Sequence, residues 1–174
     1  MQIKALFLDR DGVINSDYDH VFKKEDIKFL EGIFDLVREA KKKGYIVIIV
    51  TNQAGIAKKI FSEEEFINLM KWMVKQFLKR NAIIDDYFYC PYHPEFQEIK
   101  YKNYKYDRKP YPGMLLKAKY KYNIDMKKSI FIGDKLTDMI AGEKANIGKL
   151  IYFNKNKARE YITIDNHYEI KKLI

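Results

Sequence analysis

The chain has 174 residues, of which 47% are hydrophobic and 33% are charged, and this length and composition suit one compact globular domain over residues 1–174. No apolar run approaches the roughly 20 residues that a membrane-spanning helix needs, which argues against a membrane protein. The formal net charge of +9 would suit a nucleic-acid partner, but only five of the 33 basic residues are arginine and scattered lysines mainly confer solubility, so we expect no dedicated nucleic-acid surface.

The first half of the chain alternates between apolar strands and amphipathic helices. Residues 3–8 form an apolar run that stops at the polar turn DRDG, which predicts a buried strand. Residues 31–43 have apolar side chains at helical spacing before Gly44, and residues 45–50 predict a second strand that ends in TNQAG. Ser62 and Glu65 have the spacing of a capping box. They open a helix whose predicted apolar face consists of Phe66, Ile67, Met70, Val74, Phe77 and Leu78.

The second half continues the alternation. Residues 83–89 predict a third strand, and residues 90–110 predict a long loop. Pro112 and Gly113 open a predicted helix that closes at Asn123. The remaining predictions are a strand over residues 129–132, a short helix to residue 145, a strand over residues 149–153 and a weak helix near Glu169. This order predicts an α/β fold in which helices cover both faces of a parallel sheet and ligands bind at the carboxyl ends of the strands.

Polar side chains gather where the predicted strands end. The clusters are Asp9 with Asp11, Thr51 with Asn52, Asp134 with Asp138, and, at the end of the long loop, Arg108 with Lys109. Carboxylates that follow buried strands are costly unless a cation or hydrogen bonds compensate them. Hard oxygen ligands favour Mg²⁺, which commonly shares its shell with a substrate phosphate, and a phosphate could approach these carboxylates only if both Mg²⁺ and Lys109 were present. The sequence therefore predicts phosphoryl chemistry at this edge of the sheet.

Four segments together resemble a known family. FLDRDGVIN, VTNQAGI, RKPYPGM and IGDKLTD resemble the four motifs of the haloacid dehalogenase superfamily of phosphatases, in order, over about residues 3–153. DRDGVIN, TNQAGI and CPYHPE followed by RKPYPGM are similar to the branch that contains heptose bisphosphate phosphatases and histidinol-phosphate phosphatases. The resemblance implies a Rossmann-like domain without a cap, in which loops select the substrate.

The resemblance also implies roles for individual residues. Asp9 would be the nucleophile that attacks phosphorus, and Asp11 would act as general acid and then as general base. Asp9, the backbone carbonyl of Asp11, and Asp134 would bind Mg²⁺. Thr51 and Lys109 would stabilise the transferring phosphoryl group, and Asp138 would orient Lys109. The implied substrate contacts are Asp17, Tyr18, Asp19, His20, Asn52, Gln53, Ala54, Arg108 and Lys135.

The long loop departs from the pattern of this branch. Its relatives usually hold a structural zinc ion with Cys-x-His and Cys-x-Cys, and the corresponding positions are Cys90, Tyr92, Lys105 and Asp107. Only Cys90 is an expected ligand, so we expect no structural zinc, although Cys90, His93 and Asp107 leave open a weak metal site. Cys90 is then an ordinary reduced cysteine in a loop. We expect aromatic packing to order this region instead, through Tyr87, Phe88, Tyr89, Tyr92, Phe96, Tyr101, Tyr104, Tyr106 and Tyr111.

The expected function is Mg²⁺-dependent hydrolysis of a phosphorylated sugar, with the 7-phosphate of a heptose bisphosphate as the leading substrate. Histidinol phosphate is the nearest alternative, a nucleic-acid 3′-phosphate is the second, and a binding protein without activity is the least favoured. An acidic residue close to the N-terminus argues against a secretory signal, and a single cysteine excludes an internal disulfide. We therefore expect a cytoplasmic enzyme, and we expect it to be a monomer.

Overall fold

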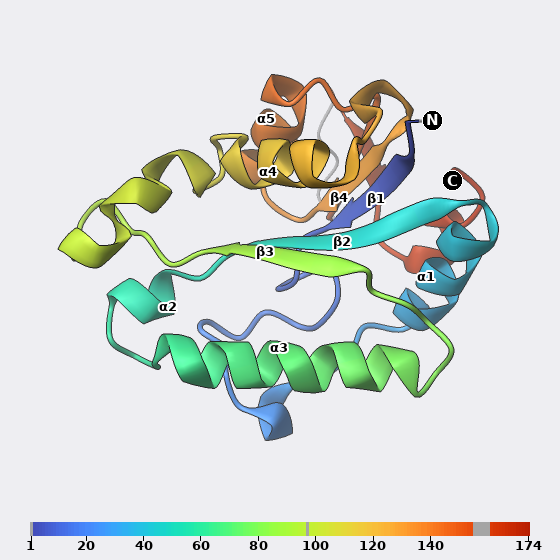
Figure 1. Cartoon of the computed structure of the whole chain (residues 1–174). Helices are drawn as coiled ribbons and strands as arrows, with labels where there is room; N and C mark the ends of the chain where they lie inside the picture. Colours follow the sequence, from blue (N-terminus) through green and yellow to red (C-terminus); the bar gives the residue numbers. More distant parts are fainter. Residues whose placement is uncertain (1, 97, 155–160) are drawn as a thin grey trace.

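The fold is built on one parallel sheet, seen in the computed structural model of Figure 1, which describes residues 2–96, 98–154 and 161–174. Within these ranges six strands pair in the order β3-β2-β1-β4-β5-β6. All neighbouring strands are parallel. The strands are β1 (Lys4–Leu8), β2 (Tyr45–Asn52), β3 (Asp86–Cys90), β4 (Ile130–Gly133), β5 (Lys149–Phe153) and β6 (Ile162–Ile164).

Helices cover both faces of the sheet, as predicted. In Figure 1, α4 and α5 lie on one side, and α1 and α3 lie on the other. The α-helices are α1 (Ile33–Lys42), α2 (Ala54–Ala57), α3 (Glu63–Leu78), α4 (Gly113–Tyr122), α5 (Leu136–Lys144) and α6 (His167–Ile170). Short 3₁₀ helices span Lys24–Asp26, Ile99–Asp107 and Met126–Lys128. In the described ranges no helix is both long enough and apolar enough to cross a membrane.

The central strand β1 explains the apolar runs of the sequence. Its residues pair with β2 on one side and with β4 on the other, so that Leu6 lies opposite both Val47 and Ile130. Ala5 to Leu8 are fully buried, because helices cover both faces of this strand. The parallel arrangement brings the carboxyl ends of β1, β2 and β4 to one edge, which confirms the α/β, Rossmann-like fold.

Helix α3 begins as predicted and ends differently. The Ser62 hydroxyl accepts a hydrogen bond from the Glu65 backbone at 3.1 Å, and the Glu65 carboxylate accepts one from the Ser62 backbone at 2.7 Å, which confirms the capping box. The inclusion of Leu78 in the apolar face was wrong, because this last helical residue is 61% exposed. Leu69 and Met73, which the predicted face omitted, are buried.

The third strand begins at Asp86 instead of residue 83. The reason is that the carboxylate of Asp85 accepts a hydrogen bond from the backbone N–H of Val47 at 2.7 Å. A side chain thereby occupies the position that a strand carbonyl would take, and Lys41 pairs with the same carboxylate at 2.7 Å. The sequence also gave no sign of β6 or α2, since an element of three or four residues carries too little periodic pattern.

The region after β3 is partly as predicted. Cys90 is the buried last residue of β3, so its assignment to the loop was wrong. The loop contains the 3₁₀ helix Ile99–Asp107, and Tyr92 and Tyr101 are buried, as the expected aromatic packing requires. Phe96, Tyr106 and Tyr111 are exposed and add no buried packing, although the rings of Tyr106 and Tyr111 contact each other with centroids 5.9 Å apart. Polar contacts with Glu63 also hold the segment, through Tyr89, Tyr101 and Lys100.

Candidate active site

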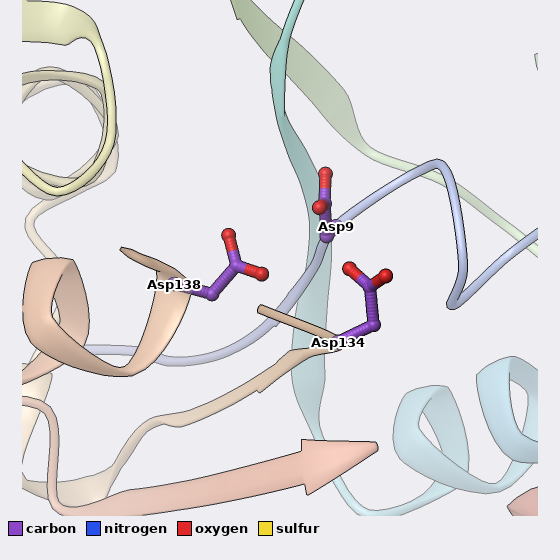
Figure 2. Close-up of side chains that lie close together, drawn as sticks. All are labelled: Asp9, Asp134 and Asp138. Atoms are coloured by element: carbon purple, nitrogen blue, oxygen red, sulfur yellow. The ribbon is translucent and has the colours of Figure 1, made fainter. Parts of the chain in front are cut away.

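Three carboxylates converge at the carboxyl edge of the sheet. Figure 2 shows Asp9 after β1, Asp134 after β4 and Asp138 on α5, and one ligand oxygen of each lies within 4.8 Å of the others. Close backbone approach makes this possible. A Cβ atom at Gly12, which has a φ of +84°, would lie 2.2 Å from Asp134 Oδ2, and one at Gly133 would lie 2.2 Å from Asp138 Cβ. Both glycines therefore leave room for the carboxylates.

Lys109 provides the positive charge among these carboxylates. Its side chain is only 3% exposed, and Nζ lies 3.0 Å from Asp9 Oδ1 and 2.6 Å from Asp138 Oδ1. Nζ also donates a hydrogen bond to the backbone carbonyl of Val50 at 3.0 Å. Burial lowers the pKa of Lys109, but Asp138 and Asp9 outweigh it, so the pKa rises above its ordinary value. The lysine is therefore held charged, between the predicted nucleophile and Asp138.

One lysine does not balance this acidic cluster. Burial raises the pKa of Asp9 to about 8, with Lys109 opposing the shift and Asp138 and Asp134 adding to it. Burial and the charge of Asp138 raise the pKa of Asp134 to about 6. In addition, Asp134 Oδ1 is buried without a hydrogen-bond partner among the described residues. A divalent cation with oxygen ligands would satisfy this oxygen and relieve the repulsion, so the residues fit Mg²⁺.

The carboxylate of Asp11 is held from three sides. Arg10 donates to Asp11 Oδ1 from Nε and Nη2, at 3.0 and 2.8 Å, and Nη2 also lies 2.8 Å from Oδ2. Asn15 donates to Oδ1 at 3.0 Å, and Gln53 donates to Oδ2 at 3.1 Å. Arg10 is fully buried and also donates to the carbonyl of Val21 at 2.7 Å. Arg10 and Asn15 were not predicted as site residues, because the DRDG turn does not reveal that its arginine points inward.

The end of β2 provides the next group of predicted residues. Thr51 is buried, and its hydroxyl accepts a hydrogen bond from Gln53 Nε2 at 2.9 Å. Asn52 was predicted to contact substrate, but its side-chain amide contacts the backbone of Lys109: Nδ2 donates to the Lys109 carbonyl at 3.1 Å, and Oδ1 accepts from the Lys109 N–H at 3.0 Å. Asn52 thus fixes the backbone that carries the central lysine, which follows it by 57 positions.

Asp134 lines a separate cavity of about 590 Å³, whereas a cleft of about 330 Å³ connects Asp9, Asp11 and Asp138 to solvent. Most of the predicted substrate contacts line it, and so do three residues that were not predicted, Lys58, His93 and Thr137. Tyr18 does not line it; this residue is 59% exposed, and its ring lies 5.2 Å from Lys28 Nζ. Lys135 and Asp17 line the cleft and pair with each other at 3.0 Å. The predicted residues in the cleft wall are Asp9, Asp11, Asp17, Asp19, His20, Thr51, Asn52, Gln53, Ala54, Arg108, Lys109, Lys135 and Asp138.

The candidate zinc ligands have other partners. The buried Cys90 thiol donates to the carbonyl of Tyr104 at 3.3 Å, and burial raises its pKa to about 12. The carboxylate of Asp107 pairs with Lys117. Over the described ranges, the one group of side chains with the spacing of a metal site is Asp9, Asp134 and Asp138. The expected lack of a structural zinc stays a prediction.

Comparison with known proteins agrees with this arrangement. Residues 4–169 match the family described as polynucleotide kinase 3 phosphatase. The D-glycero-alpha-D-manno-heptose-1,7-bisphosphate 7-phosphatase of Campylobacter jejuni is 49% identical, over 90% of this chain and 86% of that protein. The D-glycero-beta-D-manno-heptose-1,7-bisphosphate 7-phosphatase of Photorhabdus laumondii is 45% identical, over 89% of this chain and 82% of that protein.

Solved structures share the fold over nearly the whole chain. A HAD-like phosphatase from Mesorhizobium loti has a TM-score of 0.89 and 28% identity, over 99% of this chain and 84% of that one. The D,D-heptose 1,7-bisphosphate phosphatase of B. bronchiseptica, crystallised with magnesium and phosphate, has a TM-score of 0.83 and 22% identity, over 98% of this chain and 97% of that one. The chain therefore belongs to the polynucleotide kinase 3 phosphatase family, within the haloacid dehalogenase superfamily of phosphatases.

Proposed function

We propose that this protein is a Mg²⁺-dependent phosphatase that removes the 7-phosphate of a D-glycero-D-manno-heptose 1,7-bisphosphate. The observation that carries the chemistry is the position of Lys109 Nζ, 3.0 Å from Asp9 and 2.6 Å from Asp138 at the base of a cleft. The choice of substrate rests on relatives of 45% and 49% identity that bear this activity in their names.

In the first step a carboxylate oxygen of Asp9 attacks phosphorus, and an aspartyl phosphate forms as the bond between phosphorus and the sugar oxygen breaks. Asp11 donates its proton to the departing sugar oxygen. In the second step Asp11 takes a proton from water, whose oxygen attacks phosphorus, and Asp9 leaves as a carboxylate. Inorganic phosphate and the sugar 1-phosphate are the products. Asp11 ends in the protonated state in which it began.

The surrounding groups stabilise the charge that develops on the phosphoryl oxygens. Lys109 and the Thr51 hydroxyl contribute hydrogen bonds, and Asp138 keeps Lys109 in place through the 2.6 Å ion pair. Asp9, Asp134 and the backbone carbonyl of Asp11 would hold Mg²⁺, whose charge offsets that of the phosphate and the carboxylates. The hydrogen bonds from Arg10, Asn15 and Gln53 hold the Asp11 carboxylate at the cleft, which fixes the direction of proton transfer.

A phosphate-release panel tests the proposal. Heptose 1,7-bisphosphate, histidinol phosphate and an oligonucleotide with a 3′-phosphate are compared, each with and without Mg²⁺. We expect the highest kcat/KM on the heptose bisphosphate, with no turnover after chelation of Mg²⁺. The oligonucleotide is included because the matched family takes its description from that activity. A higher kcat/KM on the oligonucleotide, falling steeply with salt, would replace the sugar by a nucleic acid.

Three further properties stay predictions: a single domain over residues 1–174, a monomer, and a cytoplasmic location. The last rests on the single cysteine, which cannot form an internal disulfide. Sedimentation of the purified protein checks the monomer.

A further inference from the structure

The C-terminal helix α6 contains a buried histidine that the proposed chemistry does not use. His167 is the first residue of this helix and is 1% exposed, whereas its neighbour Tyr168 is 47% exposed. The His167 ring stacks on Phe153, the last residue of β5, with centroids 4.5 Å apart and an angle of 28° between the ring planes. Because burial removes the ring nitrogens from water, the imidazole needs polar partners in the protein.

The polar partners of His167 are backbone groups. Nδ1 lies 2.9 Å from the carbonyl oxygen of Glu31, so we assign the proton to Nδ1, which donates to this carbonyl. Burial lowers the pKa of His167, and the backbone carbonyls of Glu31 and Val13 oppose this effect. Nε2 is buried without a hydrogen-bond partner among the described residues. The hydrogen bond from Nδ1 therefore joins α6 to the segment that precedes α1.

Glu31 belongs to a segment that is hydrogen-bonded to the turn after β1. The backbone N–H of Leu30 donates to the carbonyl of Ile14 at 2.9 Å. Gly32, which follows Glu31, has a φ of +82°, and a Cβ atom there would lie 3.1 Å from the Cβ of His167. His167 thus packs directly against the backbone that holds the turn after β1 in place.

The turn after β1 carries one of the expected metal ligands in its backbone. This ligand is the carbonyl of Asp11, and the next residue, Gly12, lines the cavity of about 590 Å³ together with Glu31, Asp134 and His167. A backbone carbonyl has no side-chain rotamers through which it could be reoriented toward a metal ion. Its position therefore depends on the segments that pack around the turn.

The stacking partner of His167 leads to a second ligand. Phe153 is followed by Asn154, whose side-chain Nδ2 donates to the backbone carbonyl of Asp134 at 3.3 Å. Helix α6 therefore contacts two segments that support the metal site. One is the segment hydrogen-bonded to the turn of Asp11, and the other is the end of β5, which contacts the backbone of Asp134.

We infer that His167 is a positioning residue for the metal site, and that its hydrogen bond to the Glu31 carbonyl holds the turn whose Asp11 carbonyl binds Mg²⁺. The inference rests on the proposed function, because it takes from it the Mg²⁺ site of Asp9, Asp134 and the Asp11 carbonyl. Residues that support metal ligands change the metal affinity by about 10-fold to 100-fold when they are replaced. His167 would act in this way through the backbone of Glu31, without touching the metal or the substrate.

Two substitutions separate the hydrogen bond of His167 from the packing of its ring. His167→Asn keeps a donor at the position of Nδ1 and removes the ring, whereas His167→Phe keeps a ring that can stack on Phe153 and removes the donor. The probe is Mn²⁺, which accepts the same octahedral oxygen ligands as Mg²⁺. Electron paramagnetic resonance measures its dissociation constant without substrate.

The metal affinity should follow the hydrogen bond and not the stability. We expect His167→Phe to raise the dissociation constant of Mn²⁺ by about tenfold and His167→Asn to leave it near the wild-type value. The melting temperature of the metal-free protein should fall more in His167→Asn, because loss of the ring leaves a cavity. Should circular dichroism show that His167→Phe does not fold, His167→Leu, which also lacks the donor, takes its place.

Tyr168→Phe is the matched control. The Tyr168 hydroxyl donates to Oε1 of the Glu31 carboxylate at 3.3 Å, so this variant removes a contact with the side chain of Glu31 and leaves its backbone carbonyl bonded to His167. This control should keep the wild-type dissociation constant.

The outcomes separate the positioning role from the proposed function. Wild-type Mn²⁺ affinity in His167→Phe, or an equal loss of affinity in His167→Asn, would overturn the role of the hydrogen bond and leave the proposed function standing. A wild-type protein that binds no Mn²⁺ would overturn both. The expected order of affinities in a protein that does not hydrolyse heptose bisphosphate would support the positioning role and overturn the proposed substrate.

Discussion

The amide of Asn52 holds the backbone of Lys109 from both sides, donating to its carbonyl at 3.1 Å and accepting from its N–H at 3.0 Å. Asn52 is the last residue of β2, and Lys109 belongs to a separate segment after β3. The contact joins the sheet to the loop that delivers the central lysine. Because Lys109 Nζ has to lie between Asp9 and Asp138, a displacement of the Lys109 backbone would also displace Nζ from these two carboxylates.

Replacement of Asn52 tests this relationship. We expect Asn52→Ala to lower kcat by about 100-fold, since a displacement of about 1 Å at a catalytic group has an effect of this order. We expect Asn52→Asp to lower kcat by a similar factor, because its second carboxylate oxygen would face the Lys109 carbonyl and could not donate a hydrogen bond to it. Asn68→Ala, at an exposed position on α3, is the control. Steady-state kinetics with unchanged circular dichroism check the prediction, and wild-type kcat in Asn52→Asp would contradict it.

Asp9→Asn should abolish turnover without unfolding the protein. The amide cannot act as the nucleophile, and we expect kcat to fall by at least roughly 10³-fold. The melting temperature of the metal-free variant should equal or exceed that of the wild type, because one of three adjacent carboxylates, two of them buried, is removed. Activity assays and thermal unfolding in EDTA measure the two effects. Residual turnover near the wild-type rate would rule out Asp9 as the nucleophile.

Stability of the metal-free protein should decrease as pH rises. Burial raises the pKa of Asp9 to about 8 and that of Asp134 to about 6, from an ordinary value of 3.8. The folded state therefore holds these protons more tightly than the unfolded state does. This contribution to the free energy of unfolding is complete below pH 3.8 and is lost as pH rises through about 6 and about 8.

Mg²⁺ should offset this loss, since it binds the ionised carboxylates. The rise in melting temperature on replacing EDTA by Mg²⁺ should be larger at pH 8 than at pH 5.5. Asp134→Asn, which lacks one ligand, should show a smaller rise at pH 8. Calorimetry in matched buffers measures both, and an equal rise at the two pH values would exclude the carboxylate cluster as the metal site.

Arg10 should matter for both stability and activity, although it does not line the cleft. Its guanidinium is fully buried against Asp11, and loss of one partner of a buried pair costs about 3 kcal/mol. We expect Arg10→Met to lower the free energy of unfolding by about this amount and kcat by at least about tenfold. Arg10→Lys should not restore kcat, because an ammonium group lacks the planar fork that reaches both Asp11 oxygens.

The control for Arg10 is Arg38→Met. Arg38 pairs with Asp35 on the surface of α1, with both side chains more than a third exposed, and exposed pairs contribute roughly 0 to 1 kcal/mol. Urea unfolding of the variants compares the two arginines. An equal decrease in the free energy of unfolding for Arg10→Met and Arg38→Met would contradict the larger contribution expected from the buried contact of Arg10 with Asp11.

Glu63 should anchor the segment that leads to Arg108 and Lys109. Its carboxylate accepts hydrogen bonds from Tyr89 at 2.8 Å and Tyr101 at 3.2 Å, and it pairs with Lys100 at 3.1 Å. The first turn of α3 is thereby joined to β3 and to the 3₁₀ helix Ile99–Asp107. We expect Glu63→Ala to lower the free energy of unfolding by about 1 to 3 kcal/mol and to raise KM.

Glu64→Ala is the matched control, because Glu64 is the exposed neighbour in the same turn of α3. Glu63→Gln keeps an acceptor for the tyrosine hydroxyls and should recover part of the loss. Hydrogen exchange over residues 98–109 reports the order of the segment directly. Unchanged exchange in Glu63→Ala would show that other contacts hold this segment.

The candidate site was predictable to the extent that its residues follow apolar runs directly. Asp9 and Asp134 come next after buried strands, and parallel strands end at one edge, so that their convergence follows from the sequence pattern. The two helix ends were equally predictable from the sequence, namely the capping box at Ser62 and the left-handed Asn123 with a φ of +51°, because local backbone chemistry determines helix ends. Short elements such as β6 were not, since three residues show no periodicity.

The sequence by itself determined the alternation of the longer strands and helices along the chain, the carboxylate edge and the identity of the groups that could react. Only the tertiary structure decided that Arg10 turns inward onto Asp11, that Asn52 holds the backbone of Lys109, and that Lys58 meets His20. The physical reason is how far apart in the sequence the interacting groups lie. A turn or a helix end is set by interactions between near neighbours, whereas the contacts of Asn52 with Lys109 and of Lys58 with His20 join residues that are 57 and 38 positions apart. Arg10 and Asp11 are neighbours in the chain, but the burial that turns Arg10 inward depends on how the sheet and its helices pack together.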